Sequence, residues 1–265
     1  MCHCRFFISI SQQFLYQSIA VSDSIPFNME KMKKIARKVV KSSFVSWCIR
    51  KEIRSRLTRG FDINGQKDGR DQYVPLLHFA IFARSYETCK FLLENGAQVN
   101  IEYKLRSSHI LPIHDAISMN CPKILKLLIE YGANLDGCND DCSEQHAIPL
   151  DIALISNKPH IVKILIDNGA EYSKIFYWSV ANNVRNEFEM LFENGANVNV
   201  PENVHGDTLL HVALKSNKRP KEIVKTLVQH GAHLNVKDWA GNTPIETTLG
   251  YKDVEMLKIC LFRDY

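Results

Sequence analysis

The sequence predicts an all-α fold, a solenoid of stacked helix pairs, and three observations carry that prediction. One six-residue segment occurs six times, a second segment precedes three of its copies at a constant distance, and apolar residues recur between the two at helical spacing. Self-similarity at a period of about 20 to 50 residues is the signature of repeat architectures. The chain has 265 residues, of which 45% are apolar and 23% charged, and this is not the composition of a disordered protein.

The first segment ends each repeat and carries glycine at its second position. Its copies are RGFDIN at 59–64, NGAQVN at 95–100, YGANLD at 131–136, NGAEYS at 168–173, NGANVN at 194–199 and HGAHLN at 230–235. Their glycines are 36, 36, 37, 26 and 36 residues apart. Because glycine adopts a left-handed backbone at little cost, we expect a helix to end at each copy.

The second segment ends 16 residues before three of these glycines and 18 residues before a fourth, Gly231. Its copies are PLLHFA at 75–80, LPIHDA at 111–116, IPLDIA at 148–153, TLLHVA at 208–213 and TPIETT at 243–248. Apolar residues such as Cys89, Leu92 and Leu93 follow at helical spacing. One helix pair of this size cannot bury its apolar stripe alone, so we expect neighbouring pairs to stack.

The two segments resemble the ankyrin repeat, whose pattern is Thr-Pro-Leu-His-x-Ala, two helices, then Gly-Ala and a β-turn. The resemblance covers residues 30–265 and implies stacked helix-turn-helix units with β-hairpin fingers, of which the first and last are degenerate. The expected unit boundaries within a domain at 29–265 are 30–64, 65–100, 101–136, 137–173, 174–199, 200–235 and 236–265. We expect the leader, residues 1–28, to lie outside the folded domain, because it has neither the repeat pattern nor a working targeting signal.

The sequence departs from the family pattern in two ways. Unit 174–199 is about ten residues short and has Tyr177 where the histidine belongs, so we expect it to lack most of its finger. The family's glycine between the two helices is also replaced throughout. The residues there are Arg84, Asn120, Asn157, Asn183, Asn217 and Lys252. Asparagine tolerates a left-handed backbone well, so we expect the turn to be retained.

The histidines of the second segment, His78, His114 and His211, are the tempting catalytic residues. No acid, nucleophile or metal partner recurs with them, and the resemblance implies a structural role, in which each bonds backbone groups that link one unit to the next. The sequence also lacks phosphate-binding glycine loops, the zinc-protease helix motif and the nucleophile elbow. We therefore expect no enzyme activity.

The strongest cluster outside the repeats is Cys138, Cys142 and His146. These are zinc-ligand types, but a closed structural site needs four ligands. A polar loop is the favoured interpretation, a zinc half-site is the alternative, and we expect no metal and no cofactor. The eight cysteines, six of them outside the Cys138–Cys142 pair, favour a reducing compartment, the cytoplasm or alternatively the nucleus.

A basic segment precedes the repeats. Residues 30–59 contain eleven Lys or Arg and two Asp or Glu, a local charge of 11 − 2 = +9. Its most basic patch consists of Lys33, Lys34, Arg37 and Lys38. We favour a solvated N-terminal cap that also meets an acidic surface on a partner. The alternative is electrostatic binding of nucleic acid or an anionic membrane.

The leading functional hypothesis is a non-catalytic scaffold or adaptor, which binds another protein. The resemblance implies a concave binding face made by the finger tips and the first helix of each unit. The candidate contacts are Tyr73, Tyr103, Arg106 and Trp239 in fingers, with Phe82 and Met119 at the ends of first helices. Aromatic, Met and Arg side chains carry most interface energy, so the N-terminal half is expected to hold the main contact. Neither a small-molecule substrate nor stable membrane insertion is expected.

Overall fold

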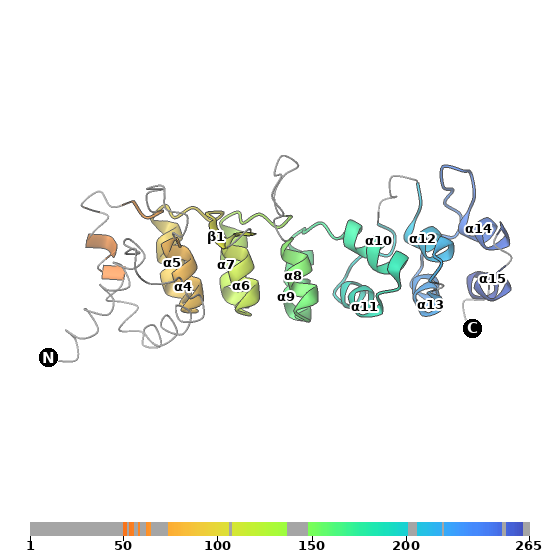
Figure 1. The fold of residues 1–265 in the computed structure, drawn as a ribbon, viewed down its shortest axis with the longest axis horizontal. Helices are drawn as coiled ribbons and strands as arrows, with labels where there is room; N and C mark the ends of the chain where they lie inside the picture. The colour runs from red at the N-terminus through yellow and green to blue at the C-terminus, as the bar shows by residue number, and fades with distance from the viewer. Residues whose placement is uncertain are drawn as a thin grey trace. The chain divides into compact units, whose positions relative to one another are not determined.

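The structure is a computed structural model with two compact parts, an N-terminal part, Met1–Ser156, and a C-terminal part, Asn157–Tyr265. The residues described are 50–51, 53–55, 58, 62–64, 74–105, 108–136, 148–200, 206–218, 220–250 and 253–261. Figure 1 shows that each part is a series of short helices laid side by side.

The N-terminal part contains α4 (Leu76–Phe82), α5 (Tyr86–Glu94), β1 (Tyr103–Leu105), β2 (Ser108–Ile110), α6 (Pro112–Ser118), α7 (Pro122–Glu130) and α8 (Pro149–Ile155). The first helices pack in the order α4, α6, α8, while the second helix α5 packs against α7. The strands β1 and β2 form an antiparallel hairpin in which Tyr103 lies opposite Ile110. This hairpin is a finger of the predicted kind.

The C-terminal part contains α9 (Pro159–Asp167), α10 (Ser173–Asn182), α11 (Arg185–Glu193), α12 (Leu209–Lys215), α13 (Lys221–Gln229), α14 (Pro244–Gly250) and α15 (Val254–Leu261). The first helices pack in the order α10, α12, α14, and the second helices α9 with α11 and α13 with α15. Helix pairs stacked in this way confirm the predicted fold class.

Four of the six substituted turns have the predicted left-handed backbone. The φ angles are 54° at Arg84, 53° at Asn120, 50° at Asn157 and 56° at Asn183. The prediction is wrong for Asn217, which has no positive φ. There α12 ends at Ser216 in an extended conformation, with φ −69° and ψ 129°, because this connection has a two-residue insertion and needs no tight turn. The sixth position, Lys252, lies outside the described residues.

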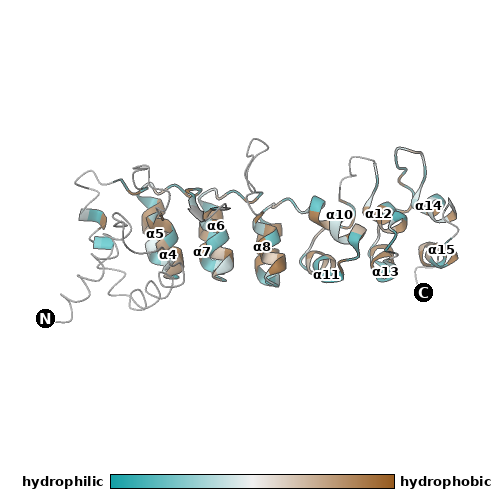
Figure 2. Ribbon diagram, in the orientation of Figure 1, coloured by the Kyte–Doolittle hydropathy of each residue, from teal (hydrophilic) through white to brown (hydrophobic). Residues whose placement is uncertain are grey.

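The core of each part consists of the apolar faces that the helix pairs turn toward one another. Ile81, Leu125, Phe176 and Leu209 are among the side chains with no exposed surface. Figure 2 shows hydrophobic and hydrophilic residues alternating around the helices, as expected when one face of each is buried. No helix among the described residues combines the length and apolar character that a membrane crossing needs.

Candidate functional site

A buried polar residue on a first helix joins neighbouring units of the N-terminal part. His78 on α4 is fully buried, and its Nε2 lies 2.8 Å from the carbonyl oxygen of Ile101, at the foot of the β1–β2 finger. Its Nδ1 lies 2.7 Å from Oδ2 of Asp115 on α6. One imidazole therefore contacts both the finger and the first helix of the following unit.

Tyr103 completes this buried cluster. Its ring lies edge-on to His78, with centroids 4.6 Å apart, and its side chain is hydrogen-bonded to Asp115. Burial raises the pKa of Tyr103, and the Asp115 carboxylate raises it further. The hydroxyl thus stays protonated and donates to the carboxylate, which fixes the finger on the helix layer.

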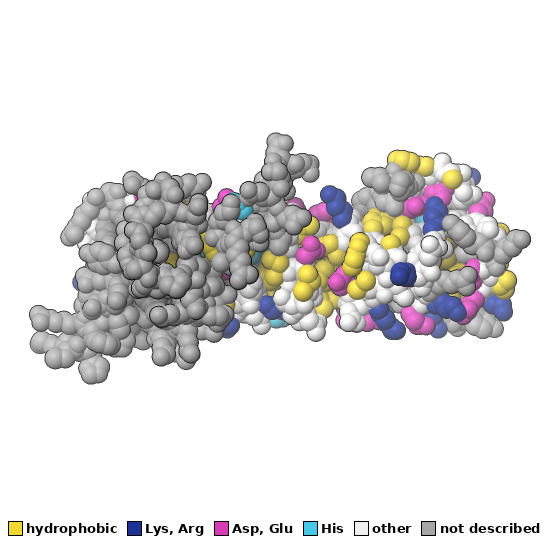
Figure 3. All heavy atoms as spheres, viewed as in Figure 1, with side chains coloured by type: hydrophobic (Ala, Val, Ile, Leu, Met, Phe, Trp, Pro, Cys, Tyr) yellow, Lys and Arg dark blue, Asp and Glu magenta, His cyan; other side chains and the backbone are white. Residues whose placement is uncertain are grey.

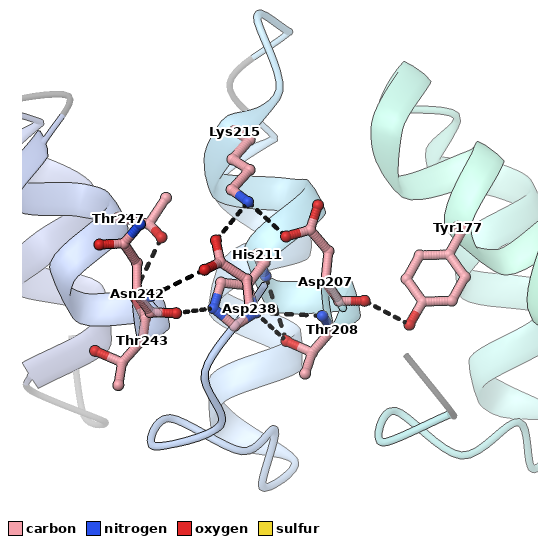
Figure 4. Close-up of polar contacts among 9 residues, drawn as sticks. All are labelled: Tyr177, Asp207, Thr208, His211, Lys215, Asp238, Asn242, Thr243 and Thr247. Carbon is pink, nitrogen blue, oxygen red and sulfur yellow. Dashed lines mark hydrogen bonds and ion pairs between the residues drawn. The ribbon is translucent and has the colours of Figure 1, made fainter. Parts of the chain in front are cut away.

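The C-terminal part has an equivalent cluster around His211 on α12, drawn in Figure 4. Nδ1 of His211 accepts a hydrogen bond from the backbone N–H of Thr208 at 3.2 Å. Nε2 lies 3.0 Å from the carbonyl oxygen of Asn242, in the loop before α14. In the N-terminal part, Nδ1 of His114 accepts from the backbone N–H of Leu111 at 3.2 Å, the same contact within a unit.

Two tyrosines connect the shortened unit to its neighbours, one to the unit that follows it and one to the unit that precedes it. Tyr177, at the histidine position of α10, donates from its hydroxyl to the carbonyl oxygen of Asp207 at 2.9 Å (Figure 4). Asp207 precedes Thr208 as Asn242 precedes Thr243, so Tyr177 makes the backbone contact that His211 makes one unit later. The connection from α9 to α10 is only residues 168–172, and Tyr172 there accepts from the backbone N–H of Asn197 at 3.1 Å.

In other units an asparagine one position later than Tyr172 accepts the equivalent backbone N–H, a role that was not predicted for it. Asn100 donates from Nδ2 to the carbonyl oxygen of Gly132 at 3.2 Å and accepts through Oδ1 from the N–H of Asn134 at 2.9 Å. Asn64 makes these two contacts with the next unit along, and Asn199 makes them in the C-terminal part. The signal was present, because an Asn closes four of the six glycine segments.

The tyrosine contact gives a direct prediction. Tyr177→Phe should lower the free energy of unfolding of the C-terminal part by about 1 kcal/mol, because it removes one hydrogen bond and keeps the ring. Urea unfolding followed by circular dichroism measures this difference. Phe substitution at Tyr131, an exposed residue at the end of α7, is the matched control and should have no effect. Equal effects from the two substitutions would show that the Tyr177 contact does not link the units.

Lys215, at the end of α12, holds two loops together. Its Nζ donates to Oδ1 of Asp207 at 2.5 Å and to Oδ2 of Asp238 at 2.8 Å (Figure 4). Partial burial lowers the pKa of Lys215, but the two carboxylate contacts outweigh burial and raise it. The hydrogen bond from Lys215 lowers the pKa of Asp238 to about 2. Lys215 is therefore engaged in positioning the loops on either side of α12.

Two tryptophans of the C-terminal part face solvent. Trp239, in the loop before α14, is 75% exposed, and Trp178, on α10 next to Tyr177, is 53% exposed. Gly206 lies beneath Trp239 with a φ of +71°, and a Cβ there would be 2.4 Å from Cδ1 of the indole. Figure 3 shows hydrophobic side chains at the surface over α10 and at the tip of the loop region before α14. The glycine thus lets the indole rest on the neighbouring loop.

Three of the predicted contact residues are corrected by the structure. Phe82 is 1% exposed, and Tyr103 and Met119 are each 4% exposed. Phe82 packs against the ring of Phe79, and Tyr103 belongs to the His78 cluster, so both stabilise the N-terminal part. A partner protein cannot reach these side chains without opening that packing. Ile155, which occupies on α8 the register position of Phe82 on α4, is 80% exposed and was not predicted.

Several other predictions concern residues outside the described ranges. They are the leader 1–28, the basic patch Lys33, Lys34, Arg37 and Lys38, the finger residues Tyr73 and Arg106, and the cluster Cys138, Cys142 and His146. Of the basic segment, the structure describes residues 50–51, 53–55 and 58. Among these, Ile53 is buried, and the guanidinium of Arg54 lies 5.3 Å from the ring centroid of Phe91. Within the described ranges, no group of His, Cys, Asp and Glu side chains could hold a metal ion.

A family model described as Ankyrin repeats (3 copies) matches residues 77–175 and 173–238, which is more than half of the chain. The B-cell lymphoma 3 protein homolog of Mus musculus is 24% identical over 183 residues, which are 69% of this chain and 34% of that protein. The probable 26S proteasome regulatory subunit p28 of Saccharomyces cerevisiae is 37% identical over 62 residues, 23% of this chain and 26% of that protein. The chain thus spans only about a third and a quarter of the length of these relatives.

A solved structure shows the same fold. The crystal structure of the ankyrin repeat domain of Bcl-3, a member of the IkappaB protein family, superposes with a TM-score of 0.58. The match covers 90% of this chain and 99% of that domain at 20% sequence identity. At this identity the likeness concerns the arrangement of the helices.

Proposed function

Because the chain belongs to the ankyrin repeat family, whose members are generally non-catalytic protein-interaction modules, we propose that it is a scaffold or adaptor that binds another protein. The proposed contact surface lies in the C-terminal part and is named here the tryptophan face. It comprises Trp178 on α10 and Trp239 in the loop before α14. The name of the yeast relative p28, a probable proteasome regulatory subunit, is consistent with a role in a protein assembly.

The observation that carries this proposal is the exposure of two large aromatic side chains on ordered elements. Tryptophan is the residue most enriched among interface residues that dominate binding energy, and a rigid indole loses little conformational entropy on binding. Asp207 and Asp238, bound to the same Lys215, hold the loops on both sides of α12. A surface positioned in this way before binding requires little ordering when the partner arrives.

The proposal moves the main contact away from the N-terminal half, because Phe82, Tyr103 and Met119 are buried there. Ile155 on α8 is an exposed apolar side chain that the N-terminal part offers at the register position of Phe82. It is proposed as a secondary contact. The basic segment 30–59 remains a proposed site for an acidic surface of the partner.

The proposed location is the cytoplasm, with the nucleus as the alternative. Among the described residues, Cys89, Cys121 and Cys260 are buried thiols that are not joined in disulfides, which is typical of proteins from reducing compartments.

Quantitative co-precipitation from extracts of the source cells tests the proposal. Trp178→Ala combined with Trp239→Ala should reduce recovery of the partner about tenfold or more, which corresponds to at least about 1.4 kcal/mol. Both side chains are exposed, so circular dichroism and the melting temperature should change little. His160→Ala, on the exposed side of α9, is the matched control and should retain the partner.

Full recovery with the double variant would contradict the tryptophan face. The electrostatic alternative makes a different prediction, since binding through residues 30–59 should fall steeply with salt and be lost on charge reversal of Lys33 and Lys34. Binding through two tryptophans should depend weakly on salt. Salt titration of the wild-type complex therefore separates the two functions.

A further inference from the structure

One position on the second helices carries a cation in three successive units. Lys90 is the fifth residue of α5, Lys126 is the fifth residue of α7, and Arg54 precedes Lys90 by the repeat spacing of 36 residues. All three residues are exposed. We name these residues the basic row. Because they share one register position, they form a line across neighbouring helices.

Packing within the N-terminal part sets the spacing of the basic row. Helix α5 packs against α7 (Figure 1), and the guanidinium of Arg54 lies above the ring of Phe91 on α5, 5.3 Å from its centroid. Packed helices are about 8–10 Å apart. Consecutive cations of the row therefore recur at about the distance between neighbouring helices.

Two further rows flank the basic row, about one helical turn away on each side. The row toward the helix starts consists of Lys51, Glu87 and Lys123, and the row toward the helix ends consists of Thr58, Glu94 and Glu130. Nζ of Lys90 lies 3.9 Å from Oε1 of Glu94, at the outer limit of an ion pair. Within the described ranges, no carboxylate pairs with Lys126. The cations of the basic row are thus available to a partner.

The C-terminal part has the same helix position but a different charge around it. Glu189 interrupts the cations there, at the fifth residue of α11. After this interruption, Lys225 on α13 and Lys258 on α15 are each flanked by a carboxylate at the second residue of the helix, Glu222 and Glu255. The excess of positive charge at this position is therefore a property of the N-terminal part.

We propose that the basic row binds an extended acidic segment of the partner protein, with carboxylates three residues apart. The inference rests on the proposed scaffold function and adds a contact separate from the tryptophan face. A chain in the polyproline II conformation has three residues per turn and rises about 3.1 Å per residue, so side chains three apart point the same way about 9 Å apart. This spacing matches the distance between neighbouring cations of the row.

The flanking carboxylates favour a peptide over a nucleic acid strand. Glu87, Glu94 and Glu130 lie beside the basic row and would repel a strand that carries a phosphate at every nucleotide. A peptide can place neutral residues opposite these carboxylates and acidic residues opposite the cations. The alternation of charge on the helices therefore selects a segment whose own charges are spaced.

Fluorescence anisotropy of labelled synthetic peptides, titrated with the full chain, tests this proposal. The probe is a peptide of about 12 residues that repeats Glu-Pro-Gln, which favours polyproline II and places a carboxylate at every third residue. It should bind with a dissociation constant of about 1–100 μM at low salt. A peptide of the same composition with its Glu residues consecutive should bind about tenfold more weakly, because only part of its charge can reach the row.

Charge reversal locates the contact. Lys90→Glu combined with Lys126→Glu should raise the dissociation constant of the spaced peptide about 30-fold or more, because carboxylates then face the carboxylates of the peptide. The matched control is Lys225→Glu combined with Lys258→Glu, the same change in net charge at the same helix position of the C-terminal part, and it should bind like the wild type. Neither Lys90 nor Lys126 is buried, so the circular dichroism spectrum should be unchanged.

Equal losses in the two double variants would show that binding follows net charge alone and would overturn the proposal. So would a peptide with consecutive Glu residues that binds as tightly as the spaced one. A single-stranded oligonucleotide of equal charge that binds more tightly than the spaced peptide would assign the basic row to nucleic acid instead. Trp178→Ala combined with Trp239→Ala should leave peptide binding unchanged, so failure of the tryptophan face and failure of the basic row are separate results.

Discussion

Replacing His78 by alanine should destabilise the N-terminal part by about 3–5 kcal/mol, because it leaves two buried polar groups without their partner, each at a cost of about 1–3 kcal/mol. The substitution removes the contact of Nδ1 with Asp115 and that of Nε2 with Ile101, both within 2.8 Å. Asp115 is 5% exposed, so water cannot fully replace the lost donor. Native-state hydrogen exchange should show faster exchange of amides in α4 and α6.

The matched control is His233→Ala, because the side chain of His233 is exposed in the C-terminal part. It should change stability by no more than about 0.5 kcal/mol. Similar effects from His78→Ala and His233→Ala would show that the cluster on α4 does not hold the finger to the following unit.

Replacing Phe82 by alanine should cost about 3–5 kcal/mol, as for other fully buried aromatic side chains. Phe82 is 1% exposed and contacts Phe79 edge-on, with ring centroids 6.4 Å apart. Ile155→Ala, at the same register position but 80% exposed, should change stability by no more than about 0.5 kcal/mol. Thermal unfolding of the two variants measures the difference.

The Phe82 result decides whether the side chain at the end of α4 stabilises the fold or binds the partner. If Phe82→Ala kept full stability and lost the partner, the concave face of the N-terminal half would be the contact surface after all. Because Phe82 is buried, we expect the opposite result, in which Phe82→Ala loses stability.

The helix pairs were predictable from the sequence because their signals are local. Glycine segments spaced by 36 residues, apolar residues at helical spacing and asparagine in the turns each act within one unit. The turn at Asn183 follows from that pattern, with a φ of 56°. Asn217 did not follow it, because the insertion before Pro220 lengthens the connection and removes the need for a left-handed residue.

The contact surface was less predictable because exposure depends on neighbours that a local pattern does not specify. Phe82 and Ile155 share one register position, yet they are 1% and 80% exposed, and Met119, one position later in its own unit, is 4% exposed. Residue type alone favoured the two that are buried. Trp178 was not predicted because its register position, the one after the histidine, is buried in other first helices, as at Asp115, whereas Trp178 is 53% exposed.

Site-specific photocrosslinking tests the central claim most directly. The full chain carries a photoreactive phenylalanine at position 239 and is irradiated in the source cells. Under the proposal it should form a covalent adduct with the partner protein. The same group at position 160, on α9, should not form that adduct. An adduct at 239 that disappears on addition of Trp178→Ala would support one tryptophan face. Equal adducts from positions 239 and 160, or an adduct from 160 alone, would contradict it.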